Sequence, residues 1–255
     1  YLARLEGIAR ESSVDLGRLH LAIDAGHGAA SALVGPLFEK LGARVSIEGN
    51  RPNGRNINAG FGSTHPEIVA ALVREVGADL GLAFDGDADR CIVVDEHGEV
   101  RDGDAILYLW GRHLDRVGRL PHHAIVATSM SNLGLVRALA RDGISVVRCG
   151  VGDREVVETM RREGINLGGE QSGHIVNLGV STTGDGLLTA MAIAGILARG
   201  NESLSESLAT FRRFPQILLN VRVREKIPFE HLEGVAAAVR HVEERLGEDG
   251  RSEEH

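Results

Sequence analysis

Three aspartates, each separated from the next by one residue, are the clearest candidates for chemistry in this sequence. Asp85, Asp87 and Asp89 follow directly after the apolar run 80–84, which has the length and composition of a buried strand. Carboxylates this close repel one another by about 4 kcal/mol per pair near a protein surface. A divalent cation relieves that repulsion, and oxygen ligands favour Mg²⁺ or Ca²⁺ over zinc or copper. Alternate residues of an extended segment point to the same side, so we expect a metal site, with Arg90 beside it to hold a phosphate.

Two alternatives for this acidic turn are a solvated loop and an EF-hand. Its place after a strand argues against the first, because ligands bind at the C-terminal ends of strands in open α/β sheets. An EF-hand loop counted from Asp85 needs glycine at its sixth position, where this sequence has Arg90. The flanking segments also have the pattern of strands rather than helices, so we reject the EF-hand.

A second polar loop, Gly-Gly-Glu-Gln-Ser-Gly-His, occupies residues 168–174. Glycine lets the backbone approach a ligand closely. Glu170 and Ser172 point the same way on an extended segment and can bind neighbouring hydroxyls of a sugar, and Gln171 offers a donor and an acceptor. His174 is of the residue type that exchanges protons near neutral pH. The alternative is a glycine-rich turn with a surface histidine, and no third partner makes this a catalytic triad.

Alternating strands and helices surround both loops. Two strand–helix–strand units of matched length occupy residues 19–23, 31–41 and 43–47, and residues 124–127, 133–141 and 144–147. Such alternation favours parallel sheets with right-handed crossovers. We therefore expect an α/β fold of tandem three-layer domains with mostly parallel mixed sheets. The start of a C-terminal α+β domain would follow.

The expected domain boundaries lie at 118 and 214. A predicted helix at 106–117 ends before Gly118 and Pro121, and the pattern changes again after Phe214 and Pro215. These boundaries give one domain at 18–118 and a second at 119–214. A helix at 186–198, apolar on most faces, is expected in a core. A strand at 217–223 and an amphipathic helix at about 230–246 would begin the last unit, 215–255.

The composition excludes several functional classes. The 255 residues carry a formal net charge of −8 and no Lys/Arg run, which argues against nucleic-acid binding. Cys91 and Cys149 lack a CxxC partner and are expected to be reduced thiols of a cytoplasmic protein. No apolar run approaches the roughly 20 residues that span a bilayer, so we expect no membrane partner. The oligomeric state has no signature in the sequence, and a homodimer is one candidate.

With both loops in view, the chain resembles the α-D-phosphohexomutase superfamily. Residues 85–90 match its metal loop, DGDxDR, and residues 170–173 match its sugar loop, GExSG. Longer strings similar to those of the phosphoglucosamine mutase branch lie at 56–58, 62–67, 130–134, 152–154, 168–174 and 183–186. Phe61 stands where that branch usually has cysteine, and Glu155 stands where an aromatic residue is common. Neither departure falls in the two loops.

The resemblance implies a four-domain enzyme that interconverts glucosamine 6-phosphate and glucosamine 1-phosphate through a phosphoserine and a sugar bisphosphate, for UDP-N-acetylglucosamine synthesis. It implies Mg²⁺ on Asp85, Asp87 and Asp89, hexosamine phosphate on Glu170, Gln171, Ser172 and Gly173, and catalytic roles for Arg90 and His174. Residues 1–17 would be a remnant of the first domain, and 215–255 the incomplete start of a phosphate-binding domain. No string in the sequence matches the family's serine loop or C-terminal phosphate loop, so we expect these 255 residues to be inactive alone.

Three other functions are considered. A dinucleotide-binding dehydrogenase is suggested by residues 26–31, which approach GxGxxG, and by Glu48 near the place of a ribose contact. However, Ser31 replaces the third glycine, and both polar loops would be left unexplained. A non-catalytic sugar-phosphate binding module and a phosphomannomutase or phosphoglucomutase are the other two. Gln171 and the strings at 56–58 and 62–67 favour glucosamine.

Overall fold

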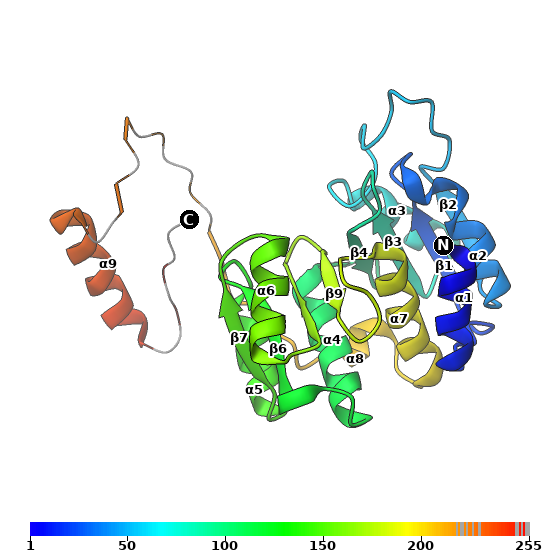
Figure 1. Cartoon of the computed structure of the whole chain (residues 1–255). Helices are drawn as coiled ribbons and strands as arrows, with labels where there is room; N and C mark the ends of the chain where they lie inside the picture. Colours follow the sequence, from blue (N-terminus) through cyan, green and yellow to red (C-terminus); the bar gives the residue numbers. More distant parts are fainter. Residues whose placement is uncertain are drawn as a thin grey trace. The chain divides into compact units, whose positions relative to one another are not determined.

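The computed structural model describes residues 1–217, 219, 222, 224–225, 227–228, 231–247, 250 and 252. Residues Tyr1–Arg212 form one compact unit, and residues Arg213–His255 are assigned to a second. The first unit contains two β-sheets with helices packed on them (Figure 1). The second unit contains helix α9 (Glu233–Leu246). The sequence predicted a helix at about 230–246, and α9 begins three residues later and ends at the expected residue. The strand expected at 217–223 lies largely outside the described residues.

The two sheets repeat one topology. The first has the order β2-β1-β3-β4-β5 and the second the order β7-β6-β8-β9. Their strands are β1 (His20–Asp24), β2 (Arg44–Glu48), β3 (Leu80–Phe84), β4 (Cys91–Val94), β5 (Val100–Arg101), β6 (Ala124–Thr128), β7 (Ser145–Cys149), β8 (Leu167–Gly169) and β9 (Ile175–Asn177). In each sheet the first three strands of this order are parallel and the fourth is antiparallel. The α/β class with mixed sheets and the repetition expected from the sequence are thus confirmed.

Helices cover both faces of the first sheet because its central strands are apolar on both sides. All residues of β1 and β3 are buried. Leu21 and Ile23 of β1 belong to the main core, which includes helix α2 (Val34–Lys40). Ala22 between them packs in a separate cluster with Val69 and Val73 of helix α3 (Glu67–Val76). This alternation makes three layers, as the doubly buried strands require.

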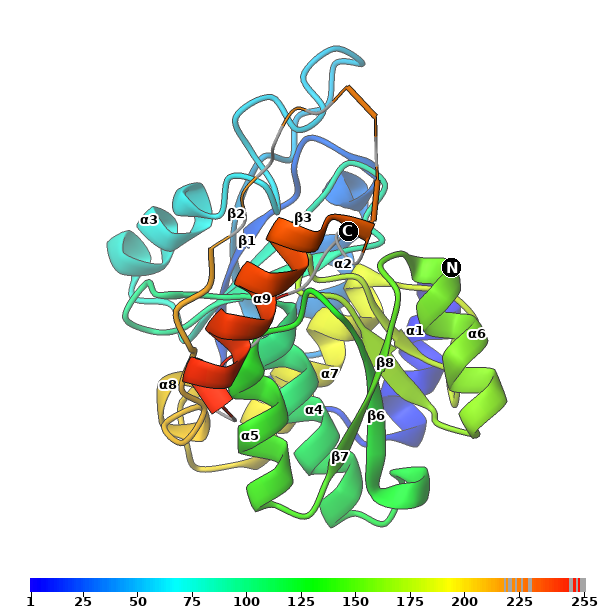
Figure 2. The same ribbon diagram turned by 90° about the vertical axis from the view of Figure 1, so that its left-hand side faces the viewer.

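The second sheet has the same three layers (Figure 2). Helix α6 (Asp153–Glu163) covers one face of strands β6 and β8, and helices α4 (Gly103–Arg116) and α5 (Leu133–Arg141) cover the other. Helix α7 (Gly186–Arg199) is mostly buried, as expected for the apolar segment 186–198. It packs on α4 and on strands β3 and β4, so it joins the second half of the chain to the first sheet. Helices α1 (Leu2–Glu11) and α8 (Leu204–Ser207) complete this unit.

The helix expected at 31–41 is divided in the structure. A 3-10 turn, Ala29–Ala32, precedes α2, which begins at Val34. Pro36 explains the division, because proline has no backbone N–H and is tolerated in the first turn of a helix but not in its interior. A continuous helix from residue 31 would have placed Pro36 in that interior.

Helix α4 begins at Gly103 rather than at the expected residue 106. The carboxylate of Asp102 accepts a hydrogen bond from the backbone N–H of Asp104 and caps the helix. Helices α3 and α6 were not predicted from the sequence. Among the described residues, no helix is both long enough and apolar enough to cross a membrane.

Candidate metal centre and adjoining polar loop

The repeated topology places the two polar loops at equivalent positions. The acidic loop, residues 85–90, joins β3 to β4, and the polar loop, residues 170–174, joins β8 to β9. Each therefore links the third and fourth strands of its sheet. The two loops touch, because the backbone N–H of Cys91 donates to the carbonyl of Gly173 at 3.1 Å and Arg90 pairs with His174 in an isolated antiparallel bridge. The sequence predicted each loop, but not their contact.

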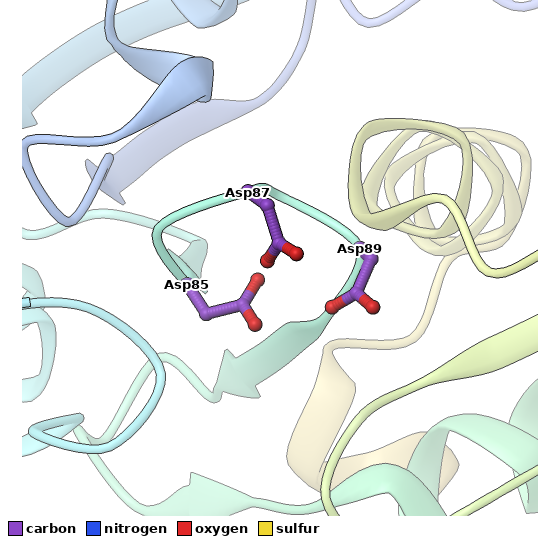
Figure 3. A group of neighbouring side chains, drawn as sticks. All are labelled: Asp85, Asp87 and Asp89. Carbon is purple, nitrogen blue, oxygen red and sulfur yellow. The ribbon is translucent and has the colours of Figure 1, made fainter. Parts of the chain in front are cut away.

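The three carboxylates of the acidic loop converge (Figure 3). One oxygen from each of Asp85, Asp87 and Asp89 lies within 4.8 Å of the other two. The backbone turns between them, since Ala88 has a φ of 62° and its N–H donates to the carbonyl of Asp85 at 3.2 Å. The expected grouping of these side chains is therefore correct. The expected cause, an extended segment, is wrong.

The carboxylates are close enough to perturb one another. Burial raises the pKa of Asp85 to about 6, and the charges of Asp89 and Asp87 act in the same direction, while the N–H of Arg90 opposes them. Asp89 Oδ1 is buried and has no hydrogen-bond partner among the described residues. The Arg90 Nε atom lies 3.6 Å from Asp85 Oδ2 and 3.7 Å from Asp89 Oδ1. Three oxygen donors with an unsatisfied oxygen and mutual repulsion suit a hard divalent cation.

Residues 26–29, which follow β1, contact the backbone of the acidic loop. The N–H of Ala29 donates to the carbonyl of Gly86 at 2.8 Å, and the N–H of Gly28 donates to Ala25 at 3.0 Å. A Cβ on Gly28 would lie 2.3 Å from the Gly86 oxygen. In the glycine-rich turn after β1, the side of Gly28 where a Cβ would project is therefore occupied by the backbone of Gly86 and not by a ligand. This argues against the dinucleotide-binding alternative.

The segment 56–63 supports the same loop from another side. A Cβ on Gly86 would lie 2.6 Å from a methyl group of Ile57 and 2.9 Å from the amide nitrogen of Asn58. Buried Asp24 anchors this segment by accepting the backbone N–H of Gly62 at 2.7 Å. Burial raises the pKa of Asp24, although that hydrogen bond opposes the shift. The strings noted at 56–58 and 62–67 thus belong to the scaffold of the acidic loop.

The polar loop presents two of its side chains together. Ser172 Oγ donates to Glu170 Oε2 at 3.2 Å, and Glu170 Oε1 accepts the backbone N–H of Gly152 at 2.9 Å. Ser172 is exposed and Glu170 is partly exposed. The alternation expected from their spacing therefore brings these two residues to one side of the loop.

Two other predicted ligand residues of this loop face the protein. The side-chain amide nitrogen of Gln171 donates to the carboxylate of buried Asp104 at 3.3 Å, and the backbone carbonyl of Gln171 accepts the backbone N–H of Gly103. Gly173 is buried with a φ of 90°, and a Cβ there would lie 2.5 Å from the Cys91 carbonyl oxygen. Both residues shape the loop. Gly103 and Asp104 were not predicted to support this loop, although the string Asp-Gly-Asp at 102–104 resembles a loop signal.

His174 lies behind the two loops rather than on the surface. Its side chain is 5% exposed, and its Nδ1 atom lies 3.1 Å from Asp89 Oδ2. A Cβ on Gly184 would lie 2.4 Å from the Cε1 atom of the imidazole, so the ring is packed directly on that residue. The structure thus overturns the surface-histidine alternative. The string 183–186 was noted in the sequence, and it provides this packing surface.

Two family models match the chain. Residues 1–98 match alpha/beta/alpha domain II of phosphoglucomutase/phosphomannomutase, and residues 102–214 match domain III. The chain belongs to the phosphoglucomutase/phosphomannomutase family. The models divide it before α4, whereas the sequence suggested a boundary after that helix, at 118. Helix α4 packs on strands β6 and β8 of the second sheet and also on β4 and β5 of the first.

Known members of the family are similar over most of this chain. The phosphoglucosamine mutase of Bacillus pumilus is 47% identical over 247 residues, which are 97% of this chain and 55% of that protein. A phosphoglucomutase/phosphomannomutase family structure from Burkholderia thailandensis is 30% identical with a TM-score of 0.72, covering 84% of this chain and 46% of that one. The Aspergillus fumigatus N-acetylphosphoglucosamine mutase, in complex with GlcNAc-6P and magnesium, shares the fold at 20% identity and a TM-score of 0.73, over 95% and 60% of the two chains. The chain spans about half the length of the curated relatives it matches.

Proposed function

We propose that this chain supplies the metal-binding and sugar-binding loops of a phosphoglucosamine mutase, which interconverts glucosamine 6-phosphate and glucosamine 1-phosphate. The observation that carries the proposal is the direct contact between the acidic loop and the polar loop, with His174 Nδ1 3.1 Å from Asp89 Oδ2. A site that transfers a phosphoryl group to a sugar needs a cation and hydroxyl-binding groups side by side. The similarity to phosphoglucosamine mutases supports the choice of substrate.

Mg²⁺ would be held by Asp85, Asp87 and Asp89. The fit rests on their converging oxygens, on the unsatisfied Asp89 Oδ1 and on the raised pKa of Asp85. When bound, the cation would neutralise the negative charge of a phosphoryl group during transfer. The family's phosphoserine matches no string in these 255 residues, so the proposal assigns the phosphoryl donor to none of them.

The chain's own side chains would bind and orient the substrate. Arg90 is held beside the carboxylates, with 43% of its side chain exposed, and its guanidinium would bind the substrate's phosphate. Glu170 and Ser172 would exchange their mutual hydrogen bond for bonds to sugar hydroxyls. Gln171 and Gly173 would contribute by fixing the loop's shape. His174 lies beside the same carboxylates, with Nδ1 3.1 Å from Asp89 Oδ2, and the proton transfer expected of its imidazole stays part of this proposal.

The test is mutase activity of the protein expressed from its complete coding sequence, with Mg²⁺ and a trace of sugar bisphosphate. Glucosamine, glucose and mannose 6-phosphates are compared as substrates. We expect the highest kcat/KM for glucosamine 6-phosphate, and a loss on the order of 100-fold or more in Asp87→Asn. Glu163→Gln, which removes an exposed carboxylate from α6, is the matched control and should retain activity.

Two other outcomes would contradict part of the proposal. A preference for the mannose or glucose substrate would retain metal-assisted phosphoryl transfer and overturn the assigned substrate. If the protein binds these sugar phosphates but turns over none of them, the non-catalytic binding module would replace the mutase. The homodimer and the cytoplasmic location remain predictions.

A further inference from the structure

An open pocket of about 550 Å³ lies at the C-terminal ends of helices α4 and α7. Both helices have 14 residues, so each extends roughly 20 Å from its first residue. At their first residues, Gly103 N–H donates to the carbonyl of Gln171 and Gly186 N–H donates to the carbonyl of Ala88. The two helices pack on each other (Figure 1). The pocket is therefore separate from the acidic and polar loops, which lie at the other ends of the same helices.

Buried apolar side chains form the base of this pocket. Leu109 of α4, Ile144 before β7 and Leu197 of α7 line it and are buried, and Ile196 of α7 lines it and is partly buried. Pockets of about 300–1,000 Å³ with an apolar lining and a few polar groups are typical of sites for small organic molecules. The size and the base therefore suit an organic ligand better than a bare ion.

Most of the charged side chains that line the pocket already have partners. The pairs are Arg112 Nε with Asp142 Oδ2 at 2.7 Å, Asp115 Oδ1 with His123 Nδ1 at 2.5 Å, and Glu202 Oε2 with Ser207 Oγ at 3.2 Å. Arg116 is different, because it makes no ion pair with a carboxylate among the described residues. Its Nη2 atom lies 3.4 Å from Nδ1 of His113, which also lines the pocket. Arg116 and His113 are thus the polar groups that remain for a ligand.

The electrostatic field at these two residues is positive. Burial lowers the pKa of His113, and the charges of Arg116, Arg199 and Arg119 act in the same direction. Arg116 and Arg199 are the last residues of α4 and α7, and Arg119 follows α4. This local excess of positive charge contrasts with the formal net charge of −8 of the whole chain. An anionic group is the complementary ligand.

We propose that this pocket binds a small organic phosphate, with the phosphate group on Arg116 and His113 and an apolar part of the ligand on Leu109, Ile144 and Leu197. A guanidinium donates two parallel hydrogen bonds to phosphate oxygens, and charge-assisted bonds of this kind are stronger than neutral ones. The imidazole offers a further donor. This inference is independent of the proposed function, since none of these residues belongs to the acidic or the polar loop.

The experiment uses the full-length protein and three probes: phenyl phosphate, inorganic phosphate and phenol. Phenyl phosphate carries both a phosphate and an apolar ring, and each of the other probes carries one of the two groups. The ring signals of His113 are followed by nuclear magnetic resonance in protein labelled with ¹³C-histidine, and their absence in His113→Gln identifies them. Calorimetry measures the affinities. Saturating glucosamine 6-phosphate is present throughout, so that the probes do not occupy the proposed substrate site.

We expect phenyl phosphate to bind and to raise the pKa of His113, because a nearby negative charge favours the protonated ring. Inorganic phosphate should bind more weakly, and phenol should leave the pKa of His113 unchanged. Arg116→Gln should weaken the binding of phenyl phosphate about 10-fold or more, since it removes hydrogen bonds between charged groups. Arg161→Gln, which removes an exposed arginine of α6, is the matched control and should not change the affinity.

Three results would overturn the proposal. The first is a pKa of His113 that phenyl phosphate leaves unchanged, and the second is an equal affinity for phenyl phosphate in folded Arg116→Gln and in the wild type. The third is inorganic phosphate that binds as tightly as phenyl phosphate, because the site would then take a free ion and not an organic ligand. Melting curves show whether Arg116→Gln folds, and if it does not, the change in the pKa of His113 in the wild type decides. A protein that binds no glucosamine 6-phosphate would contradict the proposed function and leave the His113 measurement valid.

Discussion

The backbone N–H of Gly186 donates a hydrogen bond to the carbonyl of Ala88 at 2.9 Å. Helix α7, which is mostly buried, therefore begins on the acidic loop. The N-terminal end of a helix carries partial positive charge, so α7 also places a favourable field beside the aspartates. This contact and the bond from His174 make the acidic loop a junction of both halves of the chain.

Replacing Gly186 by alanine should damage this junction. A Cβ there would lie 2.5 Å from the carbonyl oxygen of Arg90 and 2.8 Å from that of Ala88, so backbone must move. We expect Gly186→Ala to lower the free energy of unfolding by about 1–3 kcal/mol and to weaken Mn²⁺ binding. Chemical unfolding and Mn²⁺ titration measure the two effects.

Gly195 offers a matched control in the same helix. Its Cβ would lie 3.4 and 3.5 Å from the methyl groups of Val14, which is ordinary contact. Because alanine is favoured over glycine in a helix interior by about 1 kcal/mol, Gly195→Ala should be neutral or stabilising. Equal losses of stability and metal affinity in both variants would contradict the role given to the Gly186–Ala88 contact.

Asp87→Asn should separate metal binding from folding. Asp87 is exposed, and its charge raises the pKa of Asp85. Removing that charge relieves repulsion, so the metal-free variant should melt at the same temperature as the wild type or higher. The wild type should gain about 2.7 kcal/mol at a Mg²⁺ concentration of 100 times Kd. Asp87→Asn should gain little, and an equal Mg²⁺-induced shift in melting temperature would exclude Asp87 as a ligand.

Ser172→Ala and Gln171→Ala should have different consequences, although the residues are adjacent. Ser172 is exposed, and within the described part of the chain its side chain bonds to Glu170 of the same loop, so its loss should raise KM for the sugar phosphate and leave the melting temperature unchanged. Gln171 donates to buried Asp104, so its loss should cost about 0.5–1.5 kcal/mol of stability. Steady-state kinetics and calorimetry on both variants test this. A larger KM effect in Gln171→Ala would place its amide in the binding site.

The sequence predicted the location of the acidic loop well because its signals are local. The apolar run 80–84 and the spaced aspartates suffice to place a strand and a carboxylate cluster. The turn at Ala88 was not predictable, since a positive φ at a residue other than glycine has no clear sequence signature. The convergence was expected for the wrong reason, and only the backbone of the folded chain reveals the right one.

Long-range contacts account for most of what sequence analysis missed. The bond between His174 and Asp89 depends on two loops meeting across different sheets, which no local pattern encodes. Gly103, Gly184 and Gly186 are required because backbone or a ring packs on them in the folded state. The hydrogen bond from Gln171 to Asp104 is another such contact, because its two residues are distant in sequence.

The carboxylate of Glu96, in the turn between β4 and β5, should contribute a pH-dependent part of the stability. Burial alone would raise the pKa of Glu96, but hydrogen bonds from the hydroxyls of Ser203 and Ser205 outweigh it, and the pKa lies below the usual 4.5. A carboxyl group with a lowered pKa in the folded state stabilises that state when ionised. This contribution is present above the unfolded-state pKa and is lost as the pH falls through the folded-state value.

We therefore expect Glu96→Gln to be less stable than the wild type by about 1–2 kcal/mol at pH 7, with the difference shrinking as the pH is lowered below 4.5. Urea unfolding of both proteins across this pH range measures the effect. Glu99→Gln is the control on the same hairpin, because Glu99 is exposed. A stability difference for Glu96→Gln that stays constant down to the acid limit would show that the side chain acts through packing and not through its charge.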